Sequence, residues 1–580
     1  MSFFSINVKS IFFLLAVLLV ILGNMLAPGY LLTLDMVWGD TINWVWSGDN
    51  FNNTTPVYLL LSGLNIMLPS WVVQKILLGS IFFLLLYLPY RLLPYLTSNL
   101  SRLFAGLLFT LNPFVYSRLL AGQWEVLLGY ACLPVIFYAL TRLTQKRDAR
   151  SGLMLGGSLI VVGACSIHFL YVSLLISMLW IGCHVAKSLF NGDHSPAWTL
   201  IKSSLMGILF FLCTSTYWII PALLRDTPIE NRFDSSHFEE FAVSENHLIS
   251  APLNLAVLGG FWAEGDEWRY YFIWPQSQII FWVAAFFILC LVIFGFRTLL
   301  VKKETRFVAI FLLVLGVLSY ILALGAWGGA FSSFNVWMYE NFPGWSGLRD
   351  SHKIAGVLAL VYVLFASVGF DKLVTKSKEG STVTLTLIPL IFVLPFIFGM
   401  YELFGFRGQL VPTDYPTSWY ETKAILDSSP TTEKMLVLPW QGYFSLPFAN
   451  QLVVANPTEV FFGRDQTLFG RSVGLENIYD QEVDPTYRAW DTFMHEAQFL
   501  PTETIVDTLR QYNITYLFII VNPMAEDQNL WLMPGKTISE FSTSTTLITD
   551  PKQSNVVKAL LQAPHEIIID SEVILYRFTY

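Results

Sequence analysis

Two carboxylates near the start of the chain have the residue type and the surroundings needed for acid–base chemistry. Asp35 and Asp40 follow the first apolar run, and the segment 27–55 around them contains no Lys or Arg. A carboxylate in a partly apolar pocket has a raised proton affinity, so it can act as a general base near neutral pH. The other interpretation is that both acids are solvated, because loops are mostly polar and exposed.

A basic cluster far along the chain has the composition of a phosphate site. Arg349 and Lys353 are four residues apart, so they share one face if a helix begins there. The N–H groups and dipole of such a helix start also favour an anion. We expect His352, and His168 from a short turn between two apolar runs, to line the same pocket. Alternatively, the cations only lie at the membrane interface, and a lone His at a helix end is a structural residue.

A third polar cluster, residues 112–125, joins the end of one apolar run to the start of the next. Pro113 should break or kink its helix, which is tolerated in membranes where the released carbonyls line a cavity or contact protein. Arg118, Gln123 and Glu125 would then face the same outer space, with Arg118 as a further phosphate ligand. A purely structural ion pair between Arg118 and Glu125 is an equally good interpretation.

The elements that must position these clusters are membrane-spanning helices. Hydrophobic residues make up 54% of the 580 positions and charged residues only 13%, a composition that excludes a single soluble core. Apolar runs of roughly 17–25 residues, the length that crosses a bilayer, recur over the first 400 positions. They predict about eleven helices, at 10–27, 71–93, 103–121, 126–142, 152–166, 168–187, 203–224, 277–297, 307–326, 353–370 and 382–400.

The basic residues support this helix count. If Lys9 is cytoplasmic, the loops after the second, fourth, sixth, eighth and tenth predicted helices lie in the cytoplasm. Each of these loops contains Lys or Arg, as expected for cytoplasmic loops. The opposite connections are acidic or aromatic, notably the first outer loop, 27–70, and the loop 225–275. The apolar stretch 56–68 is too short to span and should lie along the outer surface. An odd number of helices then predicts a multi-pass protein of the plasma (cytoplasmic) membrane, with its N-terminus inside and its C-terminus outside.

The membrane pattern ends at about residue 400, which divides the chain into a membrane domain, 1–400, and an extracytoplasmic domain, 401–580. The second domain contains short β-branched runs, prolines and charges, as a small α/β or α+β fold does. Its expected elements are a strand at 435–439, a helix at 502–512, a strand at 514–521 and a hairpin formed by 566–569 and 573–578.

Several function classes are excluded by what the sequence lacks. It contains no P-loop, no Gly-rich dinucleotide turn, no zinc motif and no Gly-x-Ser-x-Gly elbow, so we expect neither a cofactor nor a metal. All five cysteines fall in apolar runs, which is typical of small buried side chains. No basic patch of the kind that binds nucleic acid is present, so the expected surroundings are membrane lipids.

Together these features resemble the GT-C superfamily of membrane glycosyltransferases that use lipid-linked sugars. Within it, the sequence is most similar to the prokaryotic branch near the arabinofuranosyltransferase-D and YfhO-type proteins. The matching strings are Pro-Gly-Tyr-x3-Leu-Asp ending at Asp35, Asn-Pro-Phe and Gly-Gln-Trp within 112–124, Gly-Leu-Arg-Asp-x2-Lys ending at Lys353, and the tail segment 509–520.

The resemblance implies transfer of a sugar, with inversion at the anomeric carbon, from a polyprenyl-phosphate donor to a glycan, lipid or protein acceptor outside the cytoplasm. It implies a catalytic carboxylate in the first outer loop, where Asp35 matches the family's position best and Asp40 could be the second acid. Family members with two such acids keep them adjacent and this chain does not, so the choice between Asp35 and Asp40 as the base stays open. Arg349 and Lys353, with Arg118, would stabilise the departing lipid phosphate.

Two other functions stay open. A flippase-like transporter of lipid or polysaccharide is one, although such a carrier should contain two related halves or interrupted helix pairs, and the sequence shows neither. A non-catalytic scaffold that binds envelope polysaccharide through the C-terminal domain is the other.

Overall fold

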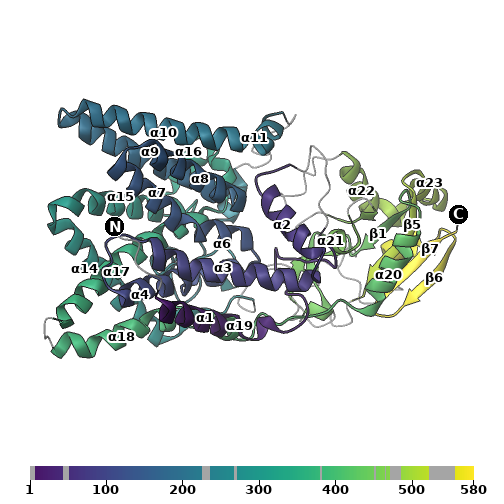
Figure 1. Cartoon of the computed structure of the whole chain (residues 1–580). Helices are drawn as coiled ribbons and strands as arrows, with labels where there is room; N and C mark the ends of the chain where they lie inside the picture. The colour runs from purple at the N-terminus through teal and green to yellow at the C-terminus, as the bar shows by residue number, and fades with distance from the viewer. Residues whose placement is uncertain are drawn as a thin grey trace.

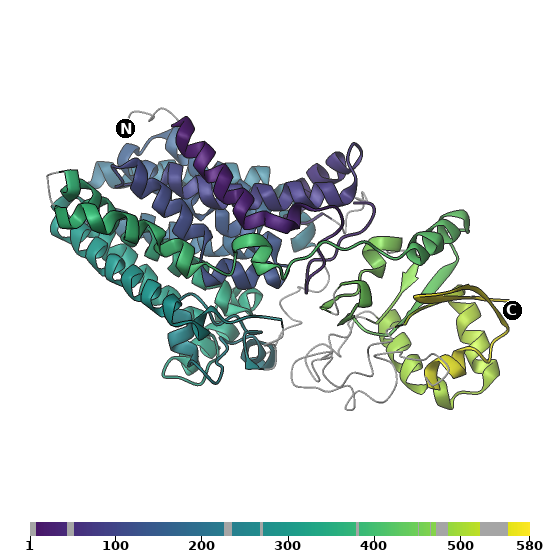
Figure 2. The same ribbon diagram turned by 90° about the horizontal axis from the view of Figure 1, so that it is seen from below.

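The structure is a computed structural model, and it describes residues 7–42, 51–224, 235–266, 271–378, 382–449, 452–463, 466–470, 485–521 and 555–579. A large block of helices occupies one side of the molecule, and a smaller domain built around a sheet lies at one end of these helices (Figures 1 and 2). Part of the acidic loop 225–275, at 225–234 and 267–270, lies outside the described residues, as does Asp49.

The helical block contains a helix at each of the eleven predicted positions. These are α1 (Val8–Leu22), α3 (Ser70–Leu92), the pairs α4–α5 (Asn99–Thr110 and Pro113–Leu120) and α6–α7 (Trp124–Ala131 and Leu133–Lys146), α8 (Ala149–Cys165), α9 (Ile167–Phe190), α10 (His194–Thr214) followed by α11 (Thr216–Leu223), α14 (Ile279–Val301), α15 (Lys303–Ala323), α17 (Ala355–Lys378) and α18 (Thr382–Phe398). Shorter helices in the connections are α2 (Thr55–Asn65), α12 (Ser235–Glu240), α13 (Ala251–Ala256) and α16 (Ser332–Asn341).

Length and composition show how many of these helices can cross a bilayer. Within the described residues, eight are long and apolar enough, and nine if the bent α4–α5 pair is one span. That pair bends by 41° where Asn112 caps α5 and Pro113 occupies its first turn, so the predicted kink is confirmed. The shorter apolar helices α8 and α18 occupy the two remaining predicted positions. The chain is a multi-pass membrane protein.

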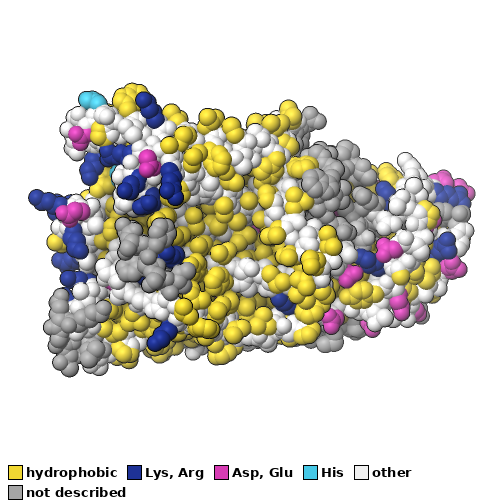
Figure 3. All heavy atoms as spheres, viewed as in Figure 1, with side chains coloured by type: hydrophobic (Ala, Val, Ile, Leu, Met, Phe, Trp, Pro, Cys, Tyr) yellow, Lys and Arg dark blue, Asp and Glu magenta, His cyan; other side chains and the backbone are white. Residues whose placement is uncertain are grey.

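The surface of the helical block has the chemistry of a membrane protein. Apolar side chains cover its middle, and Lys and Arg gather at the end away from the sheet domain (Figure 3). Side chains such as Leu205 and Ile293 are more than half exposed, which is stable only against lipid. The predicted orientation, with basic loops in the cytoplasm, fits this separation of charge and stays a prediction.

The central helix of the block is α17. Of its most apolar stretch of 18 residues, 94% are buried inside the protein. Its closest neighbour is α14, which approaches so tightly that a Cβ on Gly295 would lie 1.8 Å from the carbonyl oxygen of Phe365. Small residues at such crossings allow close backbone packing in membranes. The short 3-10 turn η7 (Ser351–Ile354) precedes α17, so the rigid core helix fixes the residues of that turn.

The C-terminal domain has the elements that the sequence predicts. Its five-stranded sheet has the order β4-β1-β5-β7-β6, with β1 parallel to β4 and β5, and the pairs β5–β7 and β6–β7 antiparallel. The strands are β1 (Lys434–Leu438), β4 (Thr467–Leu468), β5 (Ile514–Ile520), β6 (His565–Asp570) and β7 (Val573–Phe578); a separate hairpin consists of β2 (Tyr443–Ser445) and β3 (Val453–Ala455). The helices are α20 (Thr417–Ser428), α21 (Thr458–Phe462), α22 (Pro485–Glu496), α23 (Thr502–Gln511) and α24 (Asn555–Leu560).

The two predicted domains are continuous in space around residue 400. In the short turn α19 (Leu403–Arg407), Phe406 stacks on Tyr116 of α5 with ring centroids 5.9 Å apart. Further along, Thr413 pairs with Tyr30 of the first outer loop through backbone hydrogen bonds of 2.7 and 2.8 Å. The chain after α18 therefore packs along the helical block before it enters the sheet domain.

Gly122 is required where the first outer loop crosses the α5–α6 turn. Its φ is +75°, and a Cβ there would lie 2.2 Å from the backbone nitrogen of Met36. A side chain at this position would therefore push the loop, including Asp35, away from the helices.

We predict that Gly122→Ala lowers the free energy of unfolding by about 1–3 kcal/mol through backbone strain alone. Thermal unfolding in detergent measures this loss. Gly63→Ala is the matched control, because Gly63 lies in α2, where an added Cβ would have no atom within 4 Å, and alanine favours helix. Equal stability of the two variants would contradict the prediction.

Candidate active site

Three backbone hydrogen bonds hold the peptide units around Asp35. The Leu34 N–H donates to the hydroxyl of Tyr271 at 2.7 Å, and the Leu34 carbonyl accepts from the N–H of Ala455 at 2.7 Å. The Asp35 N–H donates to the carbonyl of Ala121, at the end of α5, at 3.0 Å. Because these partners come from three distant parts of the chain, the position of Asp35 is fixed by tertiary structure and not by the loop itself.

The Asp35 carboxylate is solvent-accessible and held at both oxygens. Oδ2 accepts from Nε2 of Gln123 at 3.1 Å, and Oδ1 accepts from the hydroxyl of Tyr443 at 2.9 Å. Desolvation by the surrounding protein raises the pKa of Asp35, while the two hydrogen bonds and the charge of Lys353 oppose that rise. A carboxylate with a raised pKa and an exposed side chain is suited to accept a proton.

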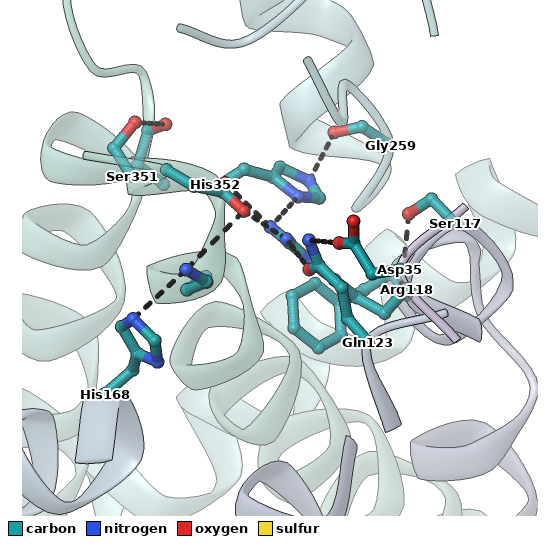
Figure 4. Close-up of polar contacts among 12 residues, drawn as sticks. Asp35, Ser117, Arg118, Gln123, His168, Gly259, Ser351 and His352 are labelled. Atoms are coloured by element: carbon teal, nitrogen blue, oxygen red, sulfur yellow. Dashed lines mark hydrogen bonds and ion pairs between the residues drawn. The ribbon is translucent and has the colours of Figure 1, made fainter. Parts of the chain in front are cut away.

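Arg118 connects Gln123 to the segment that precedes α17. Nη1 donates to Oδ2 of Asp350, and Nη2 donates to Oδ1 of Asp350 at 3.0 Å. Nη1 also donates to Oε1 of Gln123 at 2.5 Å. Nη2 contacts Nδ1 of His352 at 2.9 Å, and Nε2 of His352 contacts the carbonyl of Gly259 at 3.0 Å. Figure 4 shows these contacts as one chain from Asp35 through Gln123 and Arg118 to Gly259.

The protonation of His352 follows from its partners. Arginine only donates, so Nδ1 of His352 accepts; a carbonyl only accepts, so Nε2 carries the proton. Both ring nitrogens are therefore occupied and the ring is fully buried. His352 supports Arg118 and does not itself line an open pocket, in contrast to its expected position.

The guanidinium of Arg118 is sealed from solvent. Its side chain has 0% exposure, and the rings of Phe114 and Phe261 lie 5.4 and 4.7 Å from its Cζ atom. Burial alone would raise the pKa of Asp350, but the charges of Arg118 and Lys353 hold that pKa well below its usual range. Arg118 is thus committed to a buried ion pair, which does not fit its expected role as a ligand for lipid phosphate.

Lys353 is partly accessible to solvent. Its side chain is 11% exposed, and Nζ lies 3.9 Å from Oδ2 of Asp350. Nζ also lies 3.2 Å from Nε2 of His168, so the imidazole accepts from the ammonium and must carry its proton on Nδ1. His168 therefore lies in the predicted cluster, as a partner of Lys353.

Arg349 belongs to the same segment, but it does not share a helix face with Lys353. The 3-10 turn η6 (Trp345–Leu348) ends before Arg349, and α17 begins only at Ala355. The half-buried Arg349 places its guanidinium 5.3 Å from the ring centroid of Phe241.

Two other predicted site residues lie apart from this chain of contacts. The half-buried Asp40 lies where its charge acts on Tyr30 and Tyr420, towards the C-terminal domain. Glu125 accepts a hydrogen bond of 3.1 Å from the hydroxyl of Tyr58 on α2. Since Arg118 pairs with Asp350 instead, the interpretation of an Arg118–Glu125 ion pair is wrong.

The structure adds three residues that the sequence did not assign to the site. Asp350 pairs with Arg118, and Tyr443 donates to Asp35. Glu264 lies buried near Arg118, and its Oε2 accepts from the N–H of Gly260 at 2.8 Å. Burial raises the pKa of Glu264 to about 7. Asp350 had one available signal, an acid between two outer cations, whereas nothing local in the sequence marks Tyr443 or Glu264.

The described residues contain no group of three or more His, Cys, Asp and Glu side chains arranged to hold a metal ion. The polar groups that reach the exposed side of the cluster are the carboxylate of Asp35, the amide of Gln123 and the ammonium of Lys353. A base beside a cation has the composition needed to deprotonate a hydroxyl next to an anionic group.

The fold defines a multi-pass membrane protein with a C-terminal domain built around a mixed sheet. Residues 54–445 match the protein family described as alpha-(1->3)-arabinofuranosyltransferase, N-terminal GT-C domain. The chain belongs to this family of GT-C membrane glycosyltransferases. The matched range contains Arg118, Gln123, Lys353 and Tyr443 but begins after Asp35.

One solved structure shows the same fold. The chain is similar to the arabinofuranosyltransferase AftD from Mycobacteria, with 14% identity, a TM-score of 0.59 and coverage of 99% of this chain and 40% of that one. It therefore spans less than half of the AftD chain. Weaker similarities, at TM-scores of 0.42 and 0.43, link it to two oligosaccharyltransferase structures from Archaeoglobus fulgidus, with 12% and 10% identity and coverage of 90% and 89% of this chain and 67% and 68% of those chains. A search of curated proteins gave no significant match.

The buried ion pair predicts a strong and non-additive effect on stability. Either Arg118→Met or Asp350→Asn should lower the free energy of unfolding by about 3–5 kcal/mol, because the remaining partner stays buried without its counterpart. The double variant should lose less than the sum of the two single losses. Unfolding in detergent measures all three, with Arg349→Met as the control for loss of a half-buried arginine. Additive losses would show that the two side chains do not depend on each other.

Proposed function

We propose that this chain transfers a sugar from a polyprenyl-phosphate donor to a hydroxyl group of a glycan, lipid or protein acceptor, with Asp35 as the general base. The observation that carries the proposal is that the exposed carboxylate of Asp35 lies within electrostatic reach of the ammonium of Lys353. Transfer from a lipid phosphate needs both groups: one accepts the proton of the attacking hydroxyl, and the other stabilises charge on the leaving phosphate.

The proposed reaction is a single displacement. The acceptor hydroxyl donates its proton to Asp35 while its oxygen forms a bond to the anomeric carbon. The bond between that carbon and the phosphate oxygen breaks, and its electron pair leaves with the polyprenyl phosphate. Attack and departure on opposite faces of the sugar invert the anomeric centre, and Lys353, aided by the more distant charge of Arg349, stabilises the phosphate as it leaves.

The surroundings of Lys353 favour this role. Its neighbour His168 accepts from it as a neutral imidazole, so that contact orients the ammonium without cancelling its charge. Asp350 is closer to Arg118 than to Lys353 and is mainly neutralised by the guanidinium. Lys353 therefore keeps attraction for an anion, which the buried Arg118 lacks.

The membrane orientation belongs to the same proposal. With the Lys- and Arg-rich end of the helices in the cytoplasm (Figure 3), Asp35 and the C-terminal domain lie outside the plasma membrane. A lipid-linked donor then reaches Lys353 from the outer leaflet, and the acceptor approaches Asp35 from the aqueous side.

Two variants in one loop test the choice of base. Purified protein in lipid is incubated with a panel of polyprenyl-phosphate sugars, and release of free polyprenyl phosphate is followed. Asp35→Asn should reduce release by a factor of about 100 or more, the usual contribution of a general base. Asp40→Asn should leave it near the wild-type rate. A transporter or a scaffold would release no polyprenyl phosphate even as wild type, and equal activity of the two variants would refute the role of Asp35.

The acidic limb of the pH profile gives a separate test. Asp35 acts as a base only when it is deprotonated, so kcat/KM must fall as the pH drops through its pKa. Because desolvation by the surrounding protein raises that pKa, the limb should lie above the ordinary aspartate pKa of about 3.9. A rate that stays constant to below that pH would contradict the assignment.

A further inference from the structure

We infer that the β2–β3 hairpin of the C-terminal domain is part of the active site, and that Tyr443 is the positioning residue that aims the carboxylate of Asp35. This inference rests on the proposed role of Asp35 as base. It assigns a catalytic function to a domain that the sequence connected only with binding of polysaccharide.

The hairpin contacts the Asp35 loop at two adjacent points. Tyr443, at the start of β2, donates its hydroxyl to Oδ1 of Asp35 at 2.9 Å. Ala455, at the end of β3, donates its N–H to the carbonyl of Leu34 at 2.7 Å. Tyr443 and Ala455 face each other in the antiparallel pair, so one rigid two-stranded element holds both the side chain of Asp35 and the peptide bond before it.

The two donors on Asp35 fix its orientation because they come from different elements. Gln123 of the α5–α6 turn holds Oδ2, and Tyr443 of β2 holds Oδ1. Rotation of the carboxylate would break both hydrogen bonds. Each oxygen of a carboxylate can accept about two hydrogen bonds, so the exposed group still has acceptor positions for a substrate hydroxyl.

The charges around Asp35 explain why a neutral donor is useful there. The titratable groups that face Asp35 are Lys353 and Asp350 from the segment before α17, Tyr271 from the loop 225–275 and Tyr443 from β2. A hydrogen bond from Tyr443 stabilises the anion and lowers the pKa of Asp35 without placing a second cation beside it. The hydrogen bond therefore favours the ionised form of the base without a salt bridge.

Further contacts keep the hairpin in place relative to the helical block. The hydroxyl of Tyr415 donates to the carbonyl of Trp38 at 3.0 Å, and Thr413 both pairs with Tyr30 and donates its hydroxyl to the carbonyl of Phe448, between β2 and β3. The C-terminal domain thus contacts the first outer loop at several points between Tyr30 and Trp38. Docking of that domain is a requirement for a correctly aimed base.

Tyr443→Phe tests this role directly, since it removes one hydroxyl and keeps the ring. We expect the acidic limb of kcat/KM to move upward by about one pH unit, the effect of losing one charge-assisted hydrogen bond. We also expect kcat to fall about tenfold, with the KM for the polyprenyl-phosphate donor unchanged. Tyr516→Phe is the matched control, because its hydroxyl contacts Ser429 at 2.8 Å within the C-terminal domain.

If the acidic limb of kcat/KM for Tyr443→Phe coincides with those of the wild type and Tyr516→Phe, the role of Tyr443 is overturned. If Tyr443→Phe fails to fold in detergent, Ala455→Pro removes the hydrogen bond from the same hairpin to Leu34 and leaves the Tyr443 hydroxyl intact. It should also lower kcat about tenfold at constant KM, and an unchanged kcat would show that the hairpin is not part of the site. Asp35→Asn separates the two proposals, because a fully active Asp35→Asn refutes the base, whereas an inactive one with an unshifted Tyr443→Phe refutes only the positioning role.

Discussion

The buried ion pair between Arg118 and Asp350 is the interaction on which the site depends. A guanidinium with no solvent contact requires a carboxylate in the same low-dielectric surroundings, since either charge alone would carry a large desolvation penalty. That requirement joins α5 to the segment before α17, the most buried of the candidate membrane spans among the described residues. Through Gln123 the same guanidinium also orients the amide that holds Asp35. One oxygen of the proposed base is therefore held, through Gln123, by a buried pair of charges.

This arrangement divides the charged residues into two groups with different tasks. Both Nη atoms of Arg118 have partners, and its planar fork makes it suited to hold several acceptors in fixed directions. Lys353 is partly exposed, has a neutral imidazole as neighbour and lies within electrostatic reach of Asp35. The charges of Arg118 and Asp350 are buried and paired with each other, while the charge of Lys353, which is proposed for catalysis, keeps access to a ligand. The C-terminal domain adds the remaining constraint through Tyr443, so the site is assembled from both parts of the chain.

The sequence predicted those features that arise from local pattern. Apolar runs placed helices at all eleven positions, Pro113 predicted the bend between α4 and α5, and β-branched runs located β1, β5, β6 and β7 but not the shorter strands β2, β3 and β4. Contacts between distant residues could not be derived in this way. The partner of Arg118 lies 232 positions away and that of Asp35 in β2 lies 408 positions away, and no periodicity encodes such pairs. For the same reason the sequence could not separate Asp35 from Asp40, because only tertiary packing distinguishes two acids of one loop.

The most direct test of the account is a structure of the protein in lipid with a bound polyprenyl phosphate, determined by electron cryo-microscopy. The account predicts that the phosphate contacts the ammonium of Lys353, that its outward side faces the carboxylate of Asp35, and that the Arg118–Asp350 pair stays closed. A phosphate bound away from Lys353, or bound by Arg118 after the ion pair has opened, would contradict it.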